Sequence, residues 1–214
     1  MSLQLPSQWQ WVGAALAVAV LLQAVRRLPW YKLQGDAEAQ RIYAVFIAVA
    51  IMMRGFNTQS VMGVNLHFLG AAIATLMFGA RFALVALAVV SAAWALLGGV
   101  WLGWGWDFLA NDALPVAVTV VIGALVVRKL PAHIFIYVFG NGFFAAALSM
   151  AASVLVKAFV TDWLGGDATP YLIAMMPMSF GEAFFTGGVM ALVVAYRPQW
   201  CASFDDAKYL TRSD

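Results

Sequence analysis

Seven apolar stretches separated by short polar gaps make up most of the 214-residue chain. An α-helix needs about 20 apolar residues to cross a bilayer core, and most of the stretches approach that length. They are Trp9–Val25, Ile42–Met53, Val64–Ala80, Phe82–Trp104, Leu114–Val127, Ile134–Val160 and Tyr171–Tyr196. The pattern predicts an all-α, polytopic transmembrane bundle of about seven helices, which forms a single integral membrane domain over residues 1–214.

Three of the stretches depart from a simple span. Ile42–Met53 and Leu114–Val127 are short, so we expect their helices to continue into the neighbouring polar residues or to pack against other helices. Ile134–Val160 is longer than a span requires and carries Gly140, Asn141 and Gly142 near its start. A helix can bend or admit a close neighbour at such a place.

Composition supports a membrane protein. Hydrophobic residues account for 64% of the chain and charged residues for only 10%, whereas soluble domains are under half apolar. Lipid is therefore the first expected partner. The net charge of +2 is small and gives no reason to expect a nucleic acid partner.

The basic residues lie almost entirely in alternate gaps, which predicts the orientation of the chain. With the N-terminus outside, ten of the twelve fall in gaps on the inner side: Arg26, Arg27, Lys32, Arg41, Arg81, Arg128, Lys129, Arg197, Lys208 and Arg212. Only Arg54 and Lys157 remain outside. The positive-inside rule then predicts a multi-pass protein of the inner membrane, with its N-terminus outside and its C-terminus in the cytoplasm.

The polar stretch from Arg54 to Ser60, which includes Asn57, is followed closely by His67. We interpret it as a loop that dips into the protein from the outer side. A neutral imidazole binds nickel, cobalt, copper or zinc without bringing a charge into an apolar region. Taken alone, a histidine such as His67 is more often hydrogen-bonded between helices than bound to metal. His133 is interpreted as a solvated interface residue.

Acidic and amide side chains gather in the stretch Gly103–Asp112. Asp107, Asn111 and Asp112 offer oxygen atoms beside glycines, so the stretch is either a cation-attracting mouth or an ordinary acidic outer loop with an aromatic belt. The two interpretations are about equally supported by composition.

Glu182 lies within the last apolar stretch. A carboxylate there must face the protein interior or water and needs a partner, for which Arg81 and Lys157 are candidates. The residue is interpreted as a structural lock. The methionine groups around Met52 and Met175 are interpreted as packing residues rather than soft metal ligands.

The chain contains no Walker A loop, HExxH, Gly-x-Ser-x-Gly or Cys-x-x-Cys motif. No nucleophile and base pair can be assembled from the spacing, so we expect no enzymatic activity and no firmly bound cofactor. If the protein takes part in active transport, another subunit must hydrolyse ATP.

Four short stretches, in order, resemble the CbiM/NikM family of membrane substrate-binding components of energy-coupling-factor transporters for cobalt and nickel. They are Leu66-His67-Phe-Leu-Gly70, Phe78-Gly-Ala-Arg81, Leu109-Ala-Asn111-Asp112-Ala-Leu-Pro115 and Gly181-Glu182-Ala-Phe-Phe-Thr186-Gly. The resemblance implies Co²⁺ or Ni²⁺ as the bound substrate, a separate transmembrane coupling subunit and cytoplasmic ATPase subunits.

The resemblance also implies roles for particular residues. In the family, a Met-His start supplies its amine, a backbone nitrogen and an imidazole, and a later histidine, matched by His67, joins them. Ser2 stands here in place of the first histidine, so the chain start can contribute only the Met1 amine and a backbone amide nitrogen. Asn111 and Glu182 match supporting residues of the family, and Asn57 and Asp112 are further candidates for this role.

Two functions follow from these observations. The leading hypothesis is a substrate-binding membrane component for divalent metal uptake, with His67 as ligand and acidic outer loops that concentrate cations. The alternative is a membrane scaffold that keeps the fold and stabilises another membrane complex without transporting anything. The retained His67, Asn111 and Glu182 favour the first hypothesis, and Ser2 favours the second.

Overall fold

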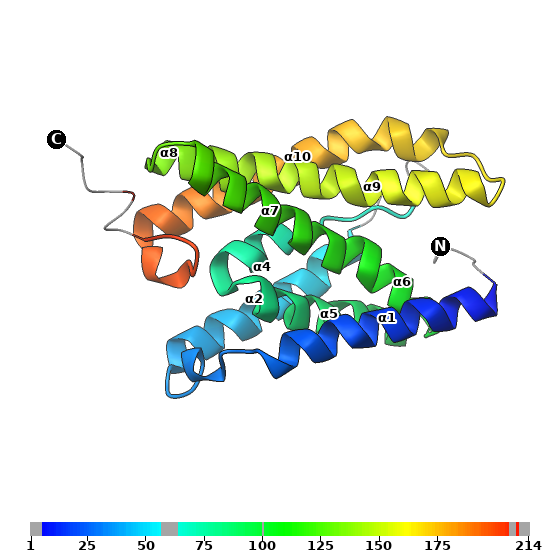
Figure 1. Ribbon diagram of the computed structural model, residues 1–214, viewed down its shortest axis with the longest axis horizontal. Coiled ribbons are helices and arrows are strands. Elements are labelled where there is room, and N and C mark those ends of the chain that lie inside the picture. Colours follow the sequence, from blue (N-terminus) through cyan, green and yellow to red (C-terminus); the bar gives the residue numbers. More distant parts are fainter. Residues whose placement is uncertain (1–5, 57–63, 100, 206–208, 210–214) are drawn as a thin grey trace.

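The chain forms an all-α bundle in a computed structural model that describes residues 6–56, 64–99, 101–205 and 209 (Figure 1). The longer helices run side by side, and short helical turns lie at their ends. In chain order the elements are α1 (Ser7–Arg26), η1 (Trp30–Lys32), α2 (Ala37–Gly55), α4 (Ala71–Phe78), α5 (Ala80–Gly98), α6 (Trp104–Phe108), η2 (Leu109–Ala113), α7 (Leu114–Lys129), α8 (Ile134–Ile136), η3 (Tyr137–Phe144), α9 (Ala145–Trp163), α10 (Thr169–Tyr196) and η4 (Pro198–Trp200).

Within the described ranges, five helical stretches are long and apolar enough to cross a membrane. They are Ser7–Arg26, Ala80–Gly98, Trp104–Lys129, Ile134–Trp163 and Thr169–Tyr196. The predicted multi-pass helical bundle is thereby confirmed. Helix α2 also reaches 19 residues, well beyond the predicted Ile42–Met53, because it begins at an Asp36 cap. The Asp36 carboxylate accepts hydrogen bonds from the amides of Glu38 and Ala39, as an N-cap does.

The prediction of a helix over Val64–Ala80 is wrong for its first half. Val64–Gly70 is not helical, and α4 covers only eight residues. Glycines at both ends of α4 explain its bounds, since Gly70 has φ 64° and Gly79 has φ 84°. Seven non-helical residues cover up to about 23 Å, and eight helical residues about 12 Å. Together they have the length of one bilayer crossing.

The predicted loop at Gly103–Asp112 is also wrong, because the chain is helical there. Helix α5 ends at Gly98, where Gly99 adopts φ 65°, so the predicted span Phe82–Trp104 was too long. The next span begins at Trp104 and continues through the π-helix η2 into α7, so the predicted Leu114–Val127 was too short. A second π-helix, η3, covers the Gly140–Gly142 stretch in which we expected a distortion.

Helices α1 and α6 touch through their backbones. A Cβ atom on Gly105 would lie 2.3 Å from the backbone nitrogen of Ala14, and one on Gly13 would meet the Trp106 ring. The indole Nε1 of Trp106 donates to the Trp9 carbonyl at 2.7 Å. Small residues thus allow the close approach that membrane helices use for packing, and they fix the start of α1 beside α6.

The segment after α10 completes the end of α4. The amide of Ala202 donates to the Met77 carbonyl at 2.9 Å, and the amide of Ser203 to the Leu76 carbonyl at 3.2 Å. The buried Cys201 thiol also lies 3.3 Å from the Leu76 carbonyl. These contacts satisfy carbonyls that the short helix leaves without an internal partner.

The helix ends that carry the basic residues predicted to face inward lie together at one end of the bundle. Figure 1 shows the C-terminal ends of α1, α7 and α10 at the same end as the start of α2 and the α4–α5 junction. The start of α1, the start of α6 and the α9–α10 connection lie at the opposite end. Each set of ends therefore occupies one face of the membrane, as the charge pattern requires.

We expect the basic end to face the cytoplasm. A reporter enzyme that is active only in the cytoplasm, fused after Asp214, should be active, and a periplasm-dependent reporter at the same position should be silent. The reverse pattern should hold for fusions in the α9–α10 connection at Gly165. A C-terminal reporter that behaves as periplasmic would contradict the orientation.

Candidate functional site

Glu182 fixes the non-helical segment that carries His67. The Glu182 side chain is fully buried in α10, and its two carboxylate oxygens accept hydrogen bonds from the amides of Leu69 and Gly70, both at 2.9 Å. Its predicted partners, Arg81 and Lys157, make no such contact; Arg81 donates to the Arg27 carbonyl instead. The interpretation of Glu182 as a structural lock agrees with this geometry, although its partners are backbone amides.

His67 is buried, with 6% of its surface exposed, and it precedes α4 rather than lying on a helix as we predicted. Its Nδ1 lies 3.0 Å from the Phe68 carbonyl oxygen. A carbonyl can only accept, so this contact requires the proton on Nδ1 and leaves the lone pair on Nε2. A charged imidazole would be costly in this buried position beside the cations Arg54 and Lys157, so the neutral ring is favoured.

A buried ion-pair cluster lies within electrostatic range of His67. The Arg54 guanidinium of α2 pairs with the Asp107 carboxylate of α6 and lies 3.4 Å from Asp112 Oδ1 in η2. Arg54 and Asp112 are almost completely buried, whereas Asp107 keeps 35% of its side chain exposed. Asp107 is thus the part of the cluster that meets solvent.

Asn111 links this cluster to α9. Its side-chain amide donates to Asp107 Oδ1 at 2.8 Å, and its oxygen accepts from Ser153 Oγ at 3.2 Å. Lys157 is buried one helical turn beyond Ser153. Its ammonium group interacts electrostatically with Asp107, Arg54 and Asp112. Two cations and two carboxylates therefore balance one another in an apolar region, as buried charges must.

The structure brings four of the predicted site residues into two neighbouring units. Glu182 holds the His67 segment, while Asn111 and Asp112 belong to the ion-pair cluster around Arg54. Met1 and Asn57 lie outside the described residues, so their predicted roles stay predictions. In the part of the chain that is described, no three His, Cys, Asp or Glu side chains cluster closely enough to hold a metal ion.

Sequence reasoning missed the Arg54 cluster, although a signal for it was present. Arg54 and Lys157 are the two basic residues that the charge pattern leaves on the acidic side of the membrane. An exception to the positive-inside rule within an apolar stretch requires a buried partner of opposite charge. Asp107 and Asp112 supply it.

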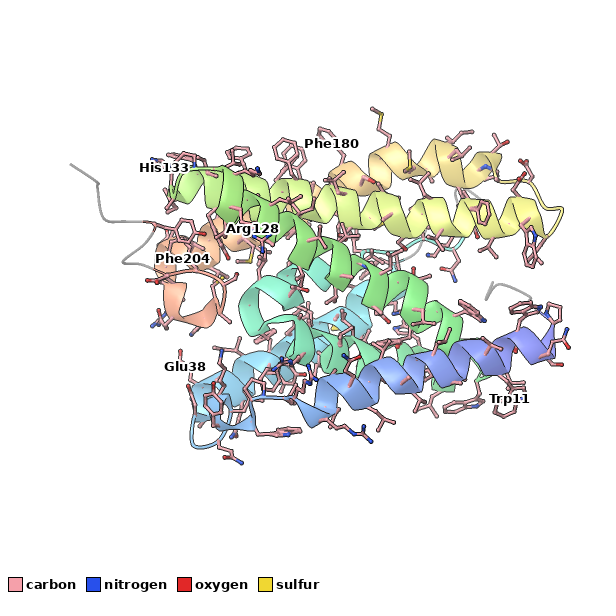
Figure 2. The ribbon with its side chains drawn as sticks, in the orientation of Figure 1. Trp11, Glu38, Arg128, His133, Phe180 and Phe204 are labelled. Atoms are coloured by element: carbon pink, nitrogen blue, oxygen red, sulfur yellow. The ribbon has the colours of Figure 1, made fainter. Side chains whose placement is uncertain are left out.

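The other histidine, His133, lies far from this site. Figure 2 shows it at the same end of the bundle as Arg128 and Glu38, opposite Trp11. His133 is exposed, and its Nδ1 accepts a hydrogen bond from the Phe135 amide at 3.2 Å. It is the N-cap of α8, which makes it a matched control for His67.

Comparison with known proteins agrees with these features. The model of one protein family, CbiM, described as "Cobalt uptake substrate-specific transmembrane region", matches residues 3–200. The crystal structure of a truncated transition metal transporter superposes with a TM-score of 0.72 at 21% sequence identity. The match covers 91% of this chain and 95% of that chain, so the two share a fold. No match was found among curated proteins.

The contact between Glu182 and the His67 segment predicts a graded effect of substitution. Glu182→Leu leaves two buried amides without an acceptor and should lower the free energy of unfolding by about 1–3 kcal/mol for each. Glu182→Gln keeps one acceptor oxygen and should lose about half as much. Thermal unfolding in mild detergent measures both, with the exposed Glu38→Leu as control, which should lose less than about 1 kcal/mol. Equal stability of the Leu, Gln and unsubstituted proteins would contradict the assigned contact.

The Arg54 cluster predicts strong coupling between Arg54 and Asp112. Arg54→Gln leaves a buried carboxylate without its cation and should destabilise the protein by about 3–5 kcal/mol. In an Asp112→Asn background the same substitution should do far less harm, because no buried charge is stranded. A double-mutant cycle on unfolding free energies measures the difference. Purely additive losses would show that the two side chains do not interact.

Proposed function

The chain belongs to the CbiM family of cobalt uptake substrate-specific transmembrane regions, and from that premise we propose that it is the substrate-binding membrane component of an uptake system for a divalent transition-metal ion. The family match over residues 3–200 carries this proposal, because it spans almost the whole bundle. The ion is of the cobalt and nickel class. A separate transmembrane coupling subunit and cytoplasmic ATPase subunits supply the energy, since the sequence has no nucleotide-binding motif.

His67 is the proposed first ligand. The contact between its Nδ1 and the Phe68 carbonyl leaves Nε2 available, and a hydrogen bond at the other nitrogen is the usual way in which proteins orient a metal-binding imidazole. Glu182 supports this ligand by holding Leu69 and Gly70 in place. A neutral ring also brings no charge of its own to a buried dication.

Nitrogen atoms of the chain start are the proposed further ligands. The contact of Trp106 with Trp9 sets the start of α1 beside α6, which also carries Asp107. Six residues precede α1, and a chain of that length reaches up to about 20 Å. The Met1 amine and the backbone amide nitrogen that follows it are the ligand type that Ni²⁺ and Cu²⁺ prefer.

The Arg54 cluster controls the charge that an incoming ion meets. Asp107 is its partly exposed member and attracts cations, while Arg54 and Lys157 oppose a dication next to His67. Asn111 keeps Asp107 in position by donating to it. In this proposal Asn111 and Asp112 act as supporting residues, which hold and balance the charges without binding the metal.

The second candidate function is a membrane scaffold. Two observations favour it: the cationic side chains of Arg54 and Lys157 act on His67, and Ser2 stands where the family has a metal-binding histidine. Both features weaken a site for a dication, while neither disturbs the contacts that hold the bundle together. A scaffold would keep the fold and assemble with another membrane complex.

Metal binding by the purified protein tests the proposal. The protein, with a free Met1 and no added tag at that end, should bind Ni²⁺ or Co²⁺ at about one ion per chain, as measured by titration calorimetry and metal analysis. His67→Ala should abolish this binding, and His133→Ala should leave it unchanged. Thermal unfolding of both variants shows whether they are folded.

A second arm tests the chain start. Acetylation of the Met1 amine delocalises its lone pair into an amide bond and should weaken binding without altering the fold. Absence of binding by the unsubstituted protein to nickel, cobalt, copper and zinc at micromolar concentration would end the metal proposal and leave the scaffold as the better account.

A further inference from the structure

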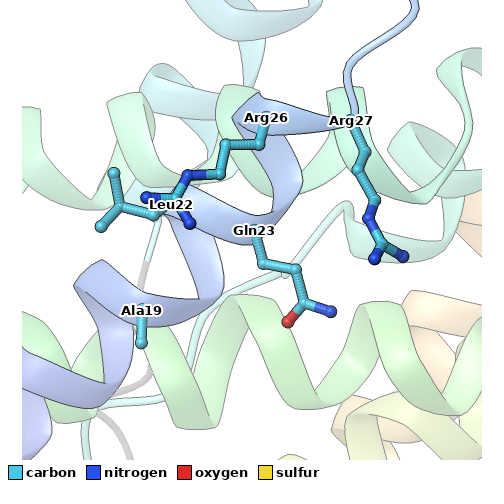
Figure 3. Close-up of a pocket in the computed structure, with 5 residues that line it drawn as sticks. All are labelled: Ala19, Leu22, Gln23, Arg26 and Arg27. Carbon is cyan, nitrogen blue, oxygen red and sulfur yellow. The ribbon is translucent and has the colours of Figure 1, made fainter.

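A hollow of about 430 Å³ lies against one face at the C-terminal end of α1 (Figure 3). The residues that line it recur at helical spacing and are Ala19, Leu22, Gln23, Arg26 and Arg27. Two of them are apolar and three carry nitrogen donors at the far end of the helix. The hollow therefore changes from apolar to cationic along α1, and it lies outside the His67 site.

The donors of this hollow suit a phosphate group. A guanidinium presents paired N–H donors that match two phosphate oxygens, and the Gln23 amide adds further donors. The side chains of Gln23 and Arg27 extend to the same side of the helix, whereas that of Arg26 extends toward Leu22 (Figure 3). The ion pairs found among described residues all involve Arg54, so no described carboxylate pairs with Arg26 or Arg27 within 4.0 Å.

A third arginine removes an electrostatic obstacle to anion binding. The last carbonyls of a helix carry partial negative charge, which would repel a phosphate at the end of α1. The Arg81 guanidinium, from the start of α5, donates to the Arg27 carbonyl at 2.6 Å and offsets that charge. Arg26, Arg27 and Arg81 thus all place positive charge near the end of α1.

The position of the hollow is that of a lipid headgroup. Arg26 follows Trp9 by seventeen positions on one helix, a rise of about 26 Å, close to the thickness of a bilayer core. The exposed rings of Trp30 and Tyr31 follow at once, as aromatic residues do at the membrane interface. The apolar side chains of Val18 and Leu22 are exposed on α1 below this level, where acyl chains lie.

We propose that this hollow binds the phosphate headgroup of an anionic phospholipid, with Arg27 and Gln23 on the phosphate oxygens, Arg26 adding positive charge, and the acyl chains along the apolar face of α1. The charge, the depth and the adjoining apolar surface are together those of a lipid and not of a free anion. Basic side chains at the cytoplasmic ends of membrane helices attract such anionic headgroups.

Native mass spectrometry of the detergent-purified protein tests the proposal. Titration with phosphatidylglycerol should give one retained lipid at concentrations at which phosphatidylcholine gives none. Each arginine near an anionic headgroup contributes about fivefold in affinity, so R26Q/R27Q should bind phosphatidylglycerol at least tenfold more weakly. R128Q/K129Q removes two cations from the same end of the bundle and should change nothing.

A charge-conserving variant keeps the test valid if R26Q/R27Q fails to fold or inserts wrongly. R26K/R27K retains the positive charge but loses the paired donors of the guanidinium, and it should retain the lipid several-fold less well. Equal retention by R26K/R27K and the unsubstituted protein would overturn the proposal, as would an equal loss in R128Q/K129Q. Displacement of the lipid by millimolar inorganic phosphate would show that the hollow takes a free anion and would overturn it as well.

Discussion

The backbone of Val64–Gly70 sets the main constraint on this bundle. Non-helical backbone surrounded by apolar side chains must find partners for its polar groups, because water is absent there and each unsatisfied group costs several kcal/mol. Glu182 meets this requirement for two successive amides with one carboxylate. The position of His67 follows from the same contact, since it lies two residues before Leu69. A charged residue in the last helix thus allows a histidine near the third crossing to be buried without a helix around it.

The Arg54 cluster solves a related problem with charges instead of backbone groups. Arg54 comes from α2, its carboxylate partners come from α6 and η2, and Asn111 extends the cluster to Ser153 on α9. Hydrophobic burial contributes little to the association of helices in lipid, so polar contacts and close backbone packing hold such elements together. Gly13 and Gly105 provide that packing between α1 and α6. The His67 segment therefore lies near a cluster of paired charges on α2, α6 and η2. Helix α6 in turn packs against the start of α1.

The sequence predicted the long helices well because lipid demands apolar runs of a fixed length. It predicted Val64–Gly70 wrongly for an equally physical reason: Leu66, Phe68 and Leu69 are as apolar as any helical segment, and hydropathy carries no information about a carboxylate more than a hundred residues away. The sequence predicted a loop at Gly103–Asp112 where the structure has a helix. The pattern alone does not show that Asp107 and Asp112 contact Arg54. Short motifs in the sequence predicted the candidate site residues one at a time. They could not predict the contacts between those residues.

Residues after α10 complete the hydrogen bonding of α4, and this has a consequence for biosynthesis. The amides of Leu69 and Gly70 donate to Glu182. The carbonyls of Met77 and Leu76 accept from the amides of Ala202 and Ser203, respectively. A ribosome makes the chain from its N-terminus, so these four groups lack their final partners until residues 182–203 have been translated. The third membrane segment is then completed well after it enters the membrane. A chain released before Ser203 would contain every long helix, but the Leu76 carbonyl would lack its partner amide. Regions of low local stability open more often and expose an incomplete product to proteolysis.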